Sequence, residues 1–338
     1  MTNLPILSQQ SMKTDNNLHH TALKPTTLKM DNKDGEEESD SGPGTDWAEL
    51  TQECLTNVLS RLTLEHRWRG AMLVCKSWLQ ACKDASLHSA FDLEPHFGLA
   101  IDSARWWTPE FERKIDSMLH SIVVWSDGSL SEIRTRHCSD RSLLVAAARC
   151  PNLQVLSVKS CPNVTDISMS KIAVQCTNLR ELDISYCYEI SHESLVLIGR
   201  NCPNLKVLKR NLMNWVDPSE HVGVVPNEYL NACPQDGDSE AAAIGNSMPY
   251  LEQLEIQFSK LSVRGLTLIC EGCPNLKYLD LSGCMDLSSR DIAKASLGVK
   301  DLEIKRPNFY IPRSVFHTER YGHWSLYDER FQTDVFRI

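Results

Sequence analysis

The chain has 338 residues, of which 42% are hydrophobic and 23% charged, as in ordinary soluble domains. The formal charge of −9 is concentrated in residues 1–46, with −4, and residues 214–240, with −6, so the rest sums to about +1. No stretch reaches the length of a membrane span, and the first 44 residues lack a signal-peptide pattern. These features predict an intracellular protein, in the nucleus and/or the cytoplasm, that binds neither membranes nor nucleic acid and keeps its 13 cysteines reduced.

Residues 1–45 are predicted to form a disordered tail. They are polar and carry GEEESDSGPG near their end, so they cannot bury enough apolar surface to fold. Phosphorylation sites are an alternative use of this tail.

Residues 46–91 are predicted to form three short helices around a small core. The first helix runs from Gln52 to about Arg61, with Thr51 as its N-cap, and the second begins near Glu65. The third carries Val74 and Trp78. One face of the first helix is apolar and consists of Leu55, Val58, Leu59 and Leu62. A core of this size is marginal without a partner to cover it.

This segment resembles the F-box motif. Its first part, WAELTQECLTNVLSRL, has the order W-x-x-L-x-x-E-x-L-x-x-V-L-S-R-L, and its second part is VCKSW. In that family the motif binds a Skp-type adaptor, which bridges to the cullin and RING subunits of a ubiquitin ligase. The resemblance implies an adaptor-binding set made of Leu50, Glu53, Leu55, Val58, Leu59, Leu62, Val74, Cys75 and Trp78. The family usually has proline at the place of Thr51. The alternative interpretation, a degenerate F-box whose apolar residues are only the core of a three-helix cap, therefore remains open.

Residues 92–126 are predicted to be a linker followed by an N-terminal cap of the next domain. Thr108, Pro109 and Glu110 form a helix start, with a capping residue, a proline in the first turn and an acid at the positive helix end. The apolar face that follows consists of Phe111, Ile115, Met118, Leu119 and Ile122. An independent partner-binding helix is the alternative.

Seven similar sequence repeats occupy residues 127–304. They start at Asp127, Cys150, Cys176, Cys202, Met248, Cys273 and Ser296, with spacings of 23, 26, 26, 46, 25 and 23 residues. Counted from each start as position zero, positions three, six and eight are apolar, except for Thr135 and Arg210 at position eight. This is the leucine-rich-repeat period, in which a short strand is followed by a helix and each unit must stack on its neighbours. The predicted fold is therefore an α/β solenoid, in which a three-helix F-box precedes a short arc of cysteine-containing leucine-rich repeats.

Cysteine recurs at two positions of these repeats. At position zero it ends the preceding helix, and at position eleven it follows the strand, as Cys138, Cys161, Cys187 and Cys284. We interpret both as small, mostly apolar residues buried between turns. A structural zinc site requires paired C-x-x-C units, and Cys270–Cys273 has no second pair, so neither a metal nor another cofactor is predicted. Cysteine-containing repeats of this kind are typical of F-box proteins.

The 46-residue spacing contains an insertion at about residues 214–236. The segment carries Trp215, Tyr229 and three prolines, and its charged residues are all acidic. Insertions in repeats lie on one face and often bind partners, so a substrate-recognition or gating loop is one hypothesis. A tolerated surface loop is the other.

The outward-facing strand residues are predicted to form a concave binding face. The position-seven row is Arg134, Ser157, Asp183, Lys209, Glu255, Asp280 and Glu303, and it runs from basic to acidic. By charge matching, we expect this face to bind an unknown protein substrate through Arg134, Arg136, Lys159, Asp183, Lys209, Trp215, Glu255, Asp280 and Glu303. A solvated face without a single partner is the alternative. Seven repeats form a shallow arc, which disfavours a closed small-molecule pocket.

Residues 305–338 are rich in aromatic side chains and are predicted to form the C-terminal cap that a solenoid end requires. From about Asp46 onward the chain resembles plant F-box proteins with leucine-rich repeats, of the Skp-interacting-partner type. The resemblance implies a non-catalytic substrate receptor of an SCF-type ubiquitin ligase, and the sequence contains no G-x-S-x-G, Walker loop or H-E-x-x-H motif. The alternative is a non-ligase repeat scaffold with a degenerate F-box.

Overall fold

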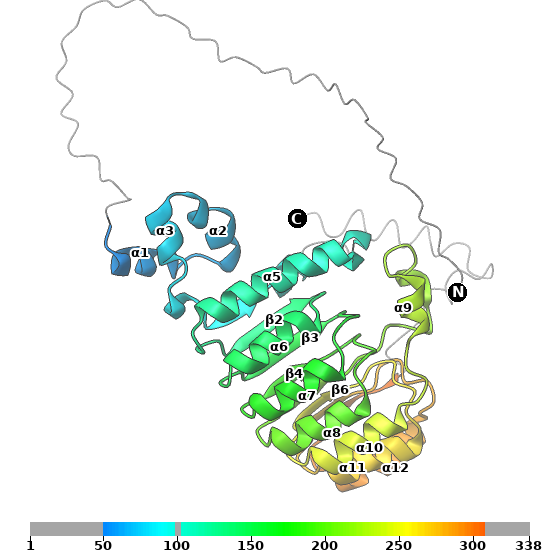
Figure 1. Ribbon diagram of the computed structural model, residues 1–338. Coiled ribbons are helices and arrows are strands. Elements are labelled where there is room, and N and C mark those ends of the chain that lie inside the picture. Colours follow the sequence, from blue (N-terminus) through cyan, green and yellow to red (C-terminus); the bar gives the residue numbers. More distant parts are fainter. Residues whose placement is uncertain (1–49, 99–102, 308–338) are drawn as a thin grey trace, which may run out of the picture. The chain divides into compact units, whose positions relative to one another are not determined.

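The computed structural model describes residues 50–98 and 103–307 (Figure 1). All described residues belong to one compact unit, Trp47–Ile338. The predicted tail and nearly all of the predicted C-terminal cap lie outside the described residues. Within the described residues, no helix is long and apolar enough to cross a membrane.

The N-terminal helices match the predicted order. They are α1 (Gln52–Leu59), α2 (Leu64–Arg69) and α3 (Lys76–Ala81), with short 3-10 turns η1 (Ala71–Leu73) and η2 (Ala85–Leu87). Thr51 caps α1 as predicted, since its hydroxyl accepts the Cys54 N–H at 3.4 Å. Their buried core consists of Leu55, Leu59, Ala71, Ala81, Cys82 and Leu87.

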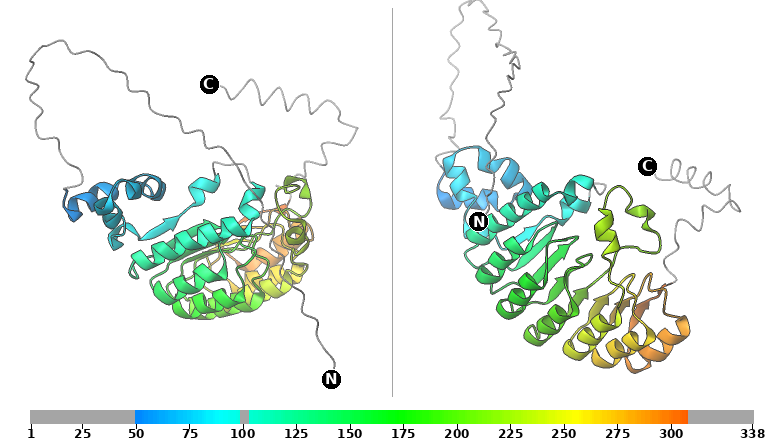
Figure 2. Two further views of the ribbon diagram at one scale, coloured as in Figure 1. Left: turned by 45° about the horizontal axis from the view of Figure 1, so that its top comes forward. Right: turned by 45° about the vertical axis from the view of Figure 1, so that its right-hand side comes forward.

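The repeats form one parallel sheet of eight strands in chain order. The strands are β1 (Ala90–Asp92), β2 (Glu132–Arg136), β3 (Val155–Lys159), β4 (Glu181–Asp183), β5 (Val207–Lys209), β6 (Gln253–Glu255), β7 (Tyr278–Asp280) and β8 (Glu303–Lys305). Figures 1 and 2 show the connecting helices on one face of this sheet: α6 (Asp140–Arg149), α7 (Asp166–Gln175), α8 (His192–Asn201), α10 (Asp238–Ser247), α11 (Val263–Gly272) and α12 (Ser289–Ala295). Strand β1 spans the predicted boundary at residue 91 and is the first strand of the sheet.

The segment between the F-box helices and β2 is mainly helical in its described residues. It contains α4 (Glu94–Gly98), η3 (Ala104–Trp107) and α5 (Pro109–Trp125), and the Thr108 hydroxyl caps α5 as predicted. Helix α5 buries Ile115, Leu119 and Ile122 in the solenoid core. The F-box helices contact α5 directly, because Trp68 packs on Trp125 with ring centroids 5.5 Å apart.

Both cysteine positions lie where the sequence predicts. Cys176 is the C-cap of α7, and burial raises the pKa of its thiol to about 12. After the strand, the Cys187 thiol donates to the Val158 carbonyl of the preceding repeat at 2.9 Å. These thiols fill the space between turns, and their high pKa keeps them protonated and unreactive.

A ladder of aspartates joins successive turns on the helical side. The N–H of Ser139 donates to Asp116, that of Thr165 to Asp140, and that of Ser191 to Asp166, each at 2.9 Å. In each step, an aspartate of one helix binds the N-cap residue of the next helix. The ladder therefore fixes the stagger between repeats by satisfying backbone donors that a helix start leaves open.

The predicted insertion interrupts this ladder and has its own structure. It contains the 3-10 turn η4 (Pro218–Glu220) and α9 (Asn227–Asn231), and α10 then begins after Gly237 without a side-chain cap. Arg210, at a position that is apolar in most repeats, is only 1% exposed. Its guanidinium donates to the Cys187 and Ile190 carbonyls at 2.6 and 2.9 Å and to Glu240 of α10 at 2.9 Å.

Candidate functional site

The F-box helices expose three large apolar side chains. Val58 at the end of α1 is 40% exposed, and Leu73 and Val74, between η1 and α3, are 77% and 60% exposed. Leu50, Leu62 and Trp78 are half-buried next to the small core. Large exposed apolar side chains on so small a domain are typical of a surface that a partner covers.

Two members of the predicted adaptor-binding set belong to the core instead. Leu55 and Leu59 are 1% and 0% exposed, because α1 turns them toward α3 and η2. They hold the three helices together, so the prediction that they touch an adaptor is revised. Leu73 was missed by the sequence analysis, because its exposure depends on the direction of a 3-10 turn that no motif position reports.

The strand surface carries a network of ion pairs. Arg134 binds Glu132 and, at 2.9 Å, Glu181, and these carboxylates raise the pKa of its guanidinium further. Arg136 lies 3.1 Å from Glu94, an acid of α4. The remaining pairs on this face join Lys159 to Asp183 at 3.3 Å, Lys159 to Glu94 at 3.6 Å, Lys209 to Glu255 at 3.2 Å and Lys305 to Asp280 at 3.1 Å.

The predicted change from basic to acidic along this face is wrong. Strand pairing places Lys305 opposite Asp280 and Glu303 opposite Tyr278, so Glu303 does not continue the row. The last repeat has two apolar candidates for the buried strand position, Leu302 and Ile304. The sequence period places Leu302 opposite Leu279, whereas in the sheet Ile304 is paired with Leu279.

The acids Asp183 and Asp280 have a structural role. Each is 2% exposed, and its carboxylate accepts an N–H two residues later, from Ser185 at 3.1 Å and from Ser282 at 2.9 Å. Each also lies beside a lysine of a neighbouring strand. They hold the turns after their strands, and their assignment as substrate contacts stays a prediction.

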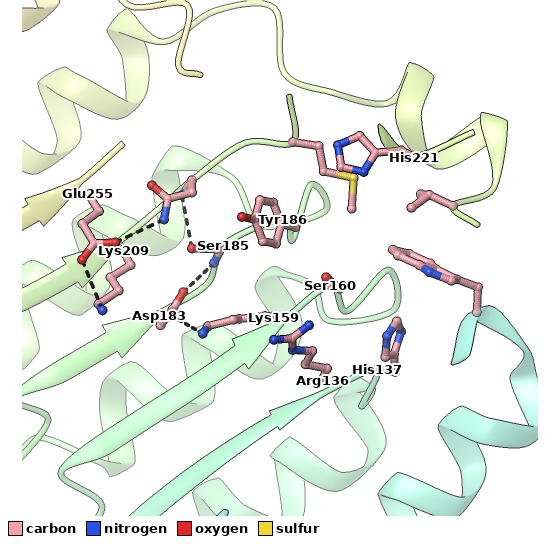
Figure 3. A pocket seen from close by; sticks show the side chains of 14 residues that line it. Arg136, His137, Lys159, Ser160, Asp183, Ser185, Tyr186, Lys209, His221 and Glu255 are labelled. Carbon is pink, nitrogen blue, oxygen red and sulfur yellow. Dashed lines mark hydrogen bonds and ion pairs between the residues drawn. The ribbon is translucent and has the colours of Figure 1, made fainter. Parts of the chain in front are cut away.

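A pocket of about 280 Å³ opens at the carboxyl ends of β2 to β6 (Figure 3). Its floor carries Arg136, Lys159, Asp183, Lys209 and Glu255 from the strands. Its walls are Trp107 of η3, Tyr186 of the turn after β4, and Met213, His221 and Val225 from the insertion. The pocket is open to solvent, and residues of the insertion form part of its wall.

Aromatic contacts hold the insertion in this place. Tyr229 of α9 stacks on Tyr188 at 4.8 Å and lies 4.9 Å from Trp107. Trp215, predicted to bind substrate, donates its Nε1–H to the Phe258 carbonyl at 2.6 Å and lies outside the pocket lining. It fastens the insertion to the next turn, and its predicted contact with a substrate stays a prediction.

The chemical groups that line the pocket are suited to binding a ligand. His137 is buried beside it, and burial, followed by the nearby Arg136 charge, lowers the pKa of its ring to about 4, so it is neutral at pH 7. Among the described residues, no group of three or more histidine, cysteine or acidic side chains could hold a metal ion. The lining therefore offers hydrogen-bond donors, ion-paired charges and aromatic walls.

Comparison with known proteins decides the family. The F-box domain model matches residues 47–89, and the Leucine Rich repeat model matches residues 175–198 and 272–285. The chain is 61% identical over 298 residues to "F-box protein SKIP1" of Arabidopsis thaliana, covering 87% of this chain and 99% of that protein. This chain belongs to the F-box proteins with leucine-rich repeats.

A second Arabidopsis thaliana relative of this F-box/leucine-rich-repeat protein is "Putative F-box/LRR-repeat protein 19", with 54% identity over 296 residues. That match covers 87% of this chain and 98% of the relative. The solved structure titled "Crystal structure of Rad7 and Elc1 complex in yeast" is 18% identical, covers 58% of this chain and 45% of that chain, and has a TM-score of 0.42.

Several site residues of this F-box/leucine-rich-repeat protein were missed by the sequence analysis. Glu132 and Glu181 lie at position five, a third outward row that the sequence analysis did not consider. The residues contributed by η3 and the insertion lie outside the repeat, so no period points to them. His137, Ser160 and Tyr186 lie at position ten of their repeats and have left-handed backbone conformations. The sequence could have pointed to them, because the sixth repeat has glycine, Gly283, at the same position.

Proposed function

We propose that this protein is the substrate-recognition subunit of an SCF-type ubiquitin ligase. Its F-box docks on a Skp-type adaptor, through which it joins cullin and RING subunits, and its repeats bind a protein substrate. It performs no chemistry itself and accelerates ubiquitination by holding the substrate near the transferring enzyme. We also propose that it works in the nucleus and/or the cytoplasm.

The observation that supports the adaptor contact is the exposed apolar surface of Val58, Leu73 and Val74. Fully burying one such side chain contributes roughly 1.5–3 kcal/mol. Covering all three would therefore stabilise a complex by several kcal/mol. The same cover would protect a three-helix core that is small on its own.

Direct contacts between the F-box and the solenoid support the receptor role. Beside the Trp68–Trp125 pair, the hydroxyls of Ser129 and Ser131 donate to the Ala85 and Ser89 carbonyls at 3.4 and 3.1 Å. Strand β1 continues from the F-box into the sheet without a flexible linker. An adaptor bound to the F-box would thus be held at a fixed distance from the concave face.

The test is a pull-down of the purified full-length protein with a Skp-type adaptor. The Leu73→Asp, Val74→Asp double variant changes exposed residues, so it should fold normally and lose adaptor binding by at least about 100-fold. Leu297→Asp is the matched control, because Leu297 is 84% exposed at the other end of the chain, and it should bind as the wild type does.

Failure of the folded wild type to bind any Skp-type adaptor would overturn the proposal. It would favour the second candidate, a repeat scaffold without ligase function. The observation behind that candidate is Thr51, which caps α1 where the F-box family usually has proline.

A further inference from the structure

We propose that the pocket binds one anionic side chain of the protein substrate, with its carboxylate or phosphoryl group against Arg136, Lys159 and the hydroxyl of Ser160. This deepens the proposed function, since it names the chemical feature of the substrate that the repeats recognise. Figure 3 shows these side chains at one end of the pocket, with His137 beside them and His221 across from them.

The volume of the pocket limits the occupant. Pockets for drug-sized molecules are about 300–1,000 Å³ and enclose most of the ligand. At about 280 Å³ and open to solvent, this pocket is below that range. It can take one side chain of an approaching chain, with a few waters, but it cannot enclose a larger cofactor.

The charges of the lining favour an anion. Three permanent cations, Arg136, Lys159 and Lys209, line the pocket together with two carboxylates, Asp183 and Glu255. Those carboxylates already accept hydrogen bonds, Asp183 from the Ser185 N–H and Glu255 from Asn211 and Gln253 side chains. Their repulsion of an incoming anion is therefore reduced.

Of the two cations that share Glu94, Arg136 makes two hydrogen bonds to it, at 3.1 and 3.2 Å, and Lys159 is held more loosely. Glu94 pairs with both Arg136 and Lys159, and it does not line the pocket. The Lys159 ammonium lies 3.6 Å from Glu94 and 3.3 Å from Asp183, whereas tight charge-assisted bonds measure about 2.7–2.9 Å. The ammonium can therefore turn toward a ligand without losing a short bond.

The backbone of the turns places three of the lining side chains. His137, Ser160 and Tyr186 each follow a strand at position ten, each has a positive φ (56°, 52° and 64°), and each lines the pocket. The sixth repeat has Gly283 at this position, with φ 73°. Phe258, at the same position of the fifth repeat, has a φ of 57° but does not line the pocket, so this conformation belongs to the turn of the repeat. A side chain in this conformation costs about 1 kcal/mol or more relative to glycine. Three polar side chains are thus kept at the pocket where the backbone favours glycine.

The test uses pentapeptide mixtures with a fixed central residue, titrated into the full-length protein by fluorescence polarisation. The central residue is glutamate, glutamine, phosphoserine, serine or lysine. We expect glutamate or phosphoserine to bind about tenfold tighter or more than its uncharged counterpart, as one charge-assisted hydrogen bond allows. The glutamate and phosphoserine arms distinguish a carboxylate from a phosphoryl group.

Two variants assign the binding to the pocket. Lys159→Met and Ser160→Gly should each remove most of this charge preference. Lys206→Met, an ion-paired lysine on the same sheet, and Asp301→Gly, a positive-φ residue, lie outside the pocket lining and should retain it. A preference for lysine, no dependence on central charge below about 1 mM, or a preference unchanged in both pocket variants would overturn the proposal.

Adaptor binding of the same variants separates the two proposals. If the pocket variants lose peptide binding and still bind the adaptor, both proposals stand. If the wild type binds anionic peptides and no adaptor, the ligase function fails and the pocket remains an anion site. If it binds the adaptor and no anionic peptide, only the pocket proposal fails.

Discussion

The turns before the insertion and the turn that carries it are held in place by different kinds of contact. Before the insertion, each helix start donates to an aspartate of the preceding helix, through Asp116, Asp140 and Asp166 in succession. At the insertion the ladder stops, and the buried Arg210–Glu240 pair joins β5 to α10. The ladder resumes when the Ser262 N–H donates to Asp238 at 2.7 Å. A repeated contact therefore builds the regular stack, and one charged pair bridges its interruption.

This difference matters for the site because the pocket lies where the two regions meet. Regular turns contribute its floor, with the strained residues His137, Ser160 and Tyr186, and the insertion contributes part of its wall. The regular part fixes the donors in position. The insertion decides how far the pocket is closed.

The largest expected effect comes from breaking the buried pair. Burial disfavours the charge of Arg210, but Glu240 outweighs this and raises the pKa of the guanidinium. Glu240→Ala leaves that buried charge without its partner, so we expect a loss of about 3–5 kcal/mol in the free energy of unfolding. Urea unfolding measures it, with Lys206→Met as a surface ion-pair control that should leave the midpoint unchanged.

A double variant tests whether the loss of stability comes from the unpaired buried charge. Replacing both partners, as Arg210→Met with Glu240→Met, removes the charges and should recover much of the lost stability. A Glu240→Ala variant as stable as the wild type would show that the carbonyls of Ile184, Cys187 and Ile190, which accept from the Arg210 guanidinium, suffice to hold it in place.

A smaller effect is expected from breaking one step of the ladder. Asp166→Ala leaves the partly buried Ser191 N–H without its acceptor, which should cost about 1–3 kcal/mol in the free energy of unfolding. Asp166→Asn keeps an acceptor and should cost less. Thermal or urea unfolding of both variants gives the comparison.

The chain provides a matched control for the ladder. His192 begins α8 as Asp166 begins α7, but α8 is followed by the interrupted turn, where Gly237 offers no side-chain cap. His192→Ala should therefore leave stability unchanged. Equal losses at Asp166 and His192 would mean that general helix propensity at the first position, and not the ladder, explains the effect.

The predictability of the molecule from its sequence follows the same division. The L-x-x-L-x-L period predicted the buried strand residues, and the Thr51 and Thr108 caps were predicted because capping needs only local residues. The last strand was misplaced by two residues because Leu302 and Ile304 fit the period equally well. The pocket depends on contacts such as Tyr229 with Tyr188, between segments without a common spacing. The burial of Leu55, Asp183 and Asp280 depends on the direction of each side chain. Residue type alone does not give this direction.

The smallest effect concerns the turn position itself and connects stability with function. Ser160→Gly removes the left-handed strain of one turn and, after the entropy of glycine in the unfolded chain, should change stability by less than about 1 kcal/mol, in the stabilising direction. Gly283→Ala makes the reverse change where the added carbon would lie 2.3 Å from the Phe258 ring, so it should destabilise clearly. Differential scanning calorimetry measures both. If Ser160→Gly gains stability and loses anionic-peptide binding, the serine is retained for recognition at a cost to the fold. If it loses stability as Gly283→Ala does, the hydroxyl is needed for the turn, and its strain carries no information about binding.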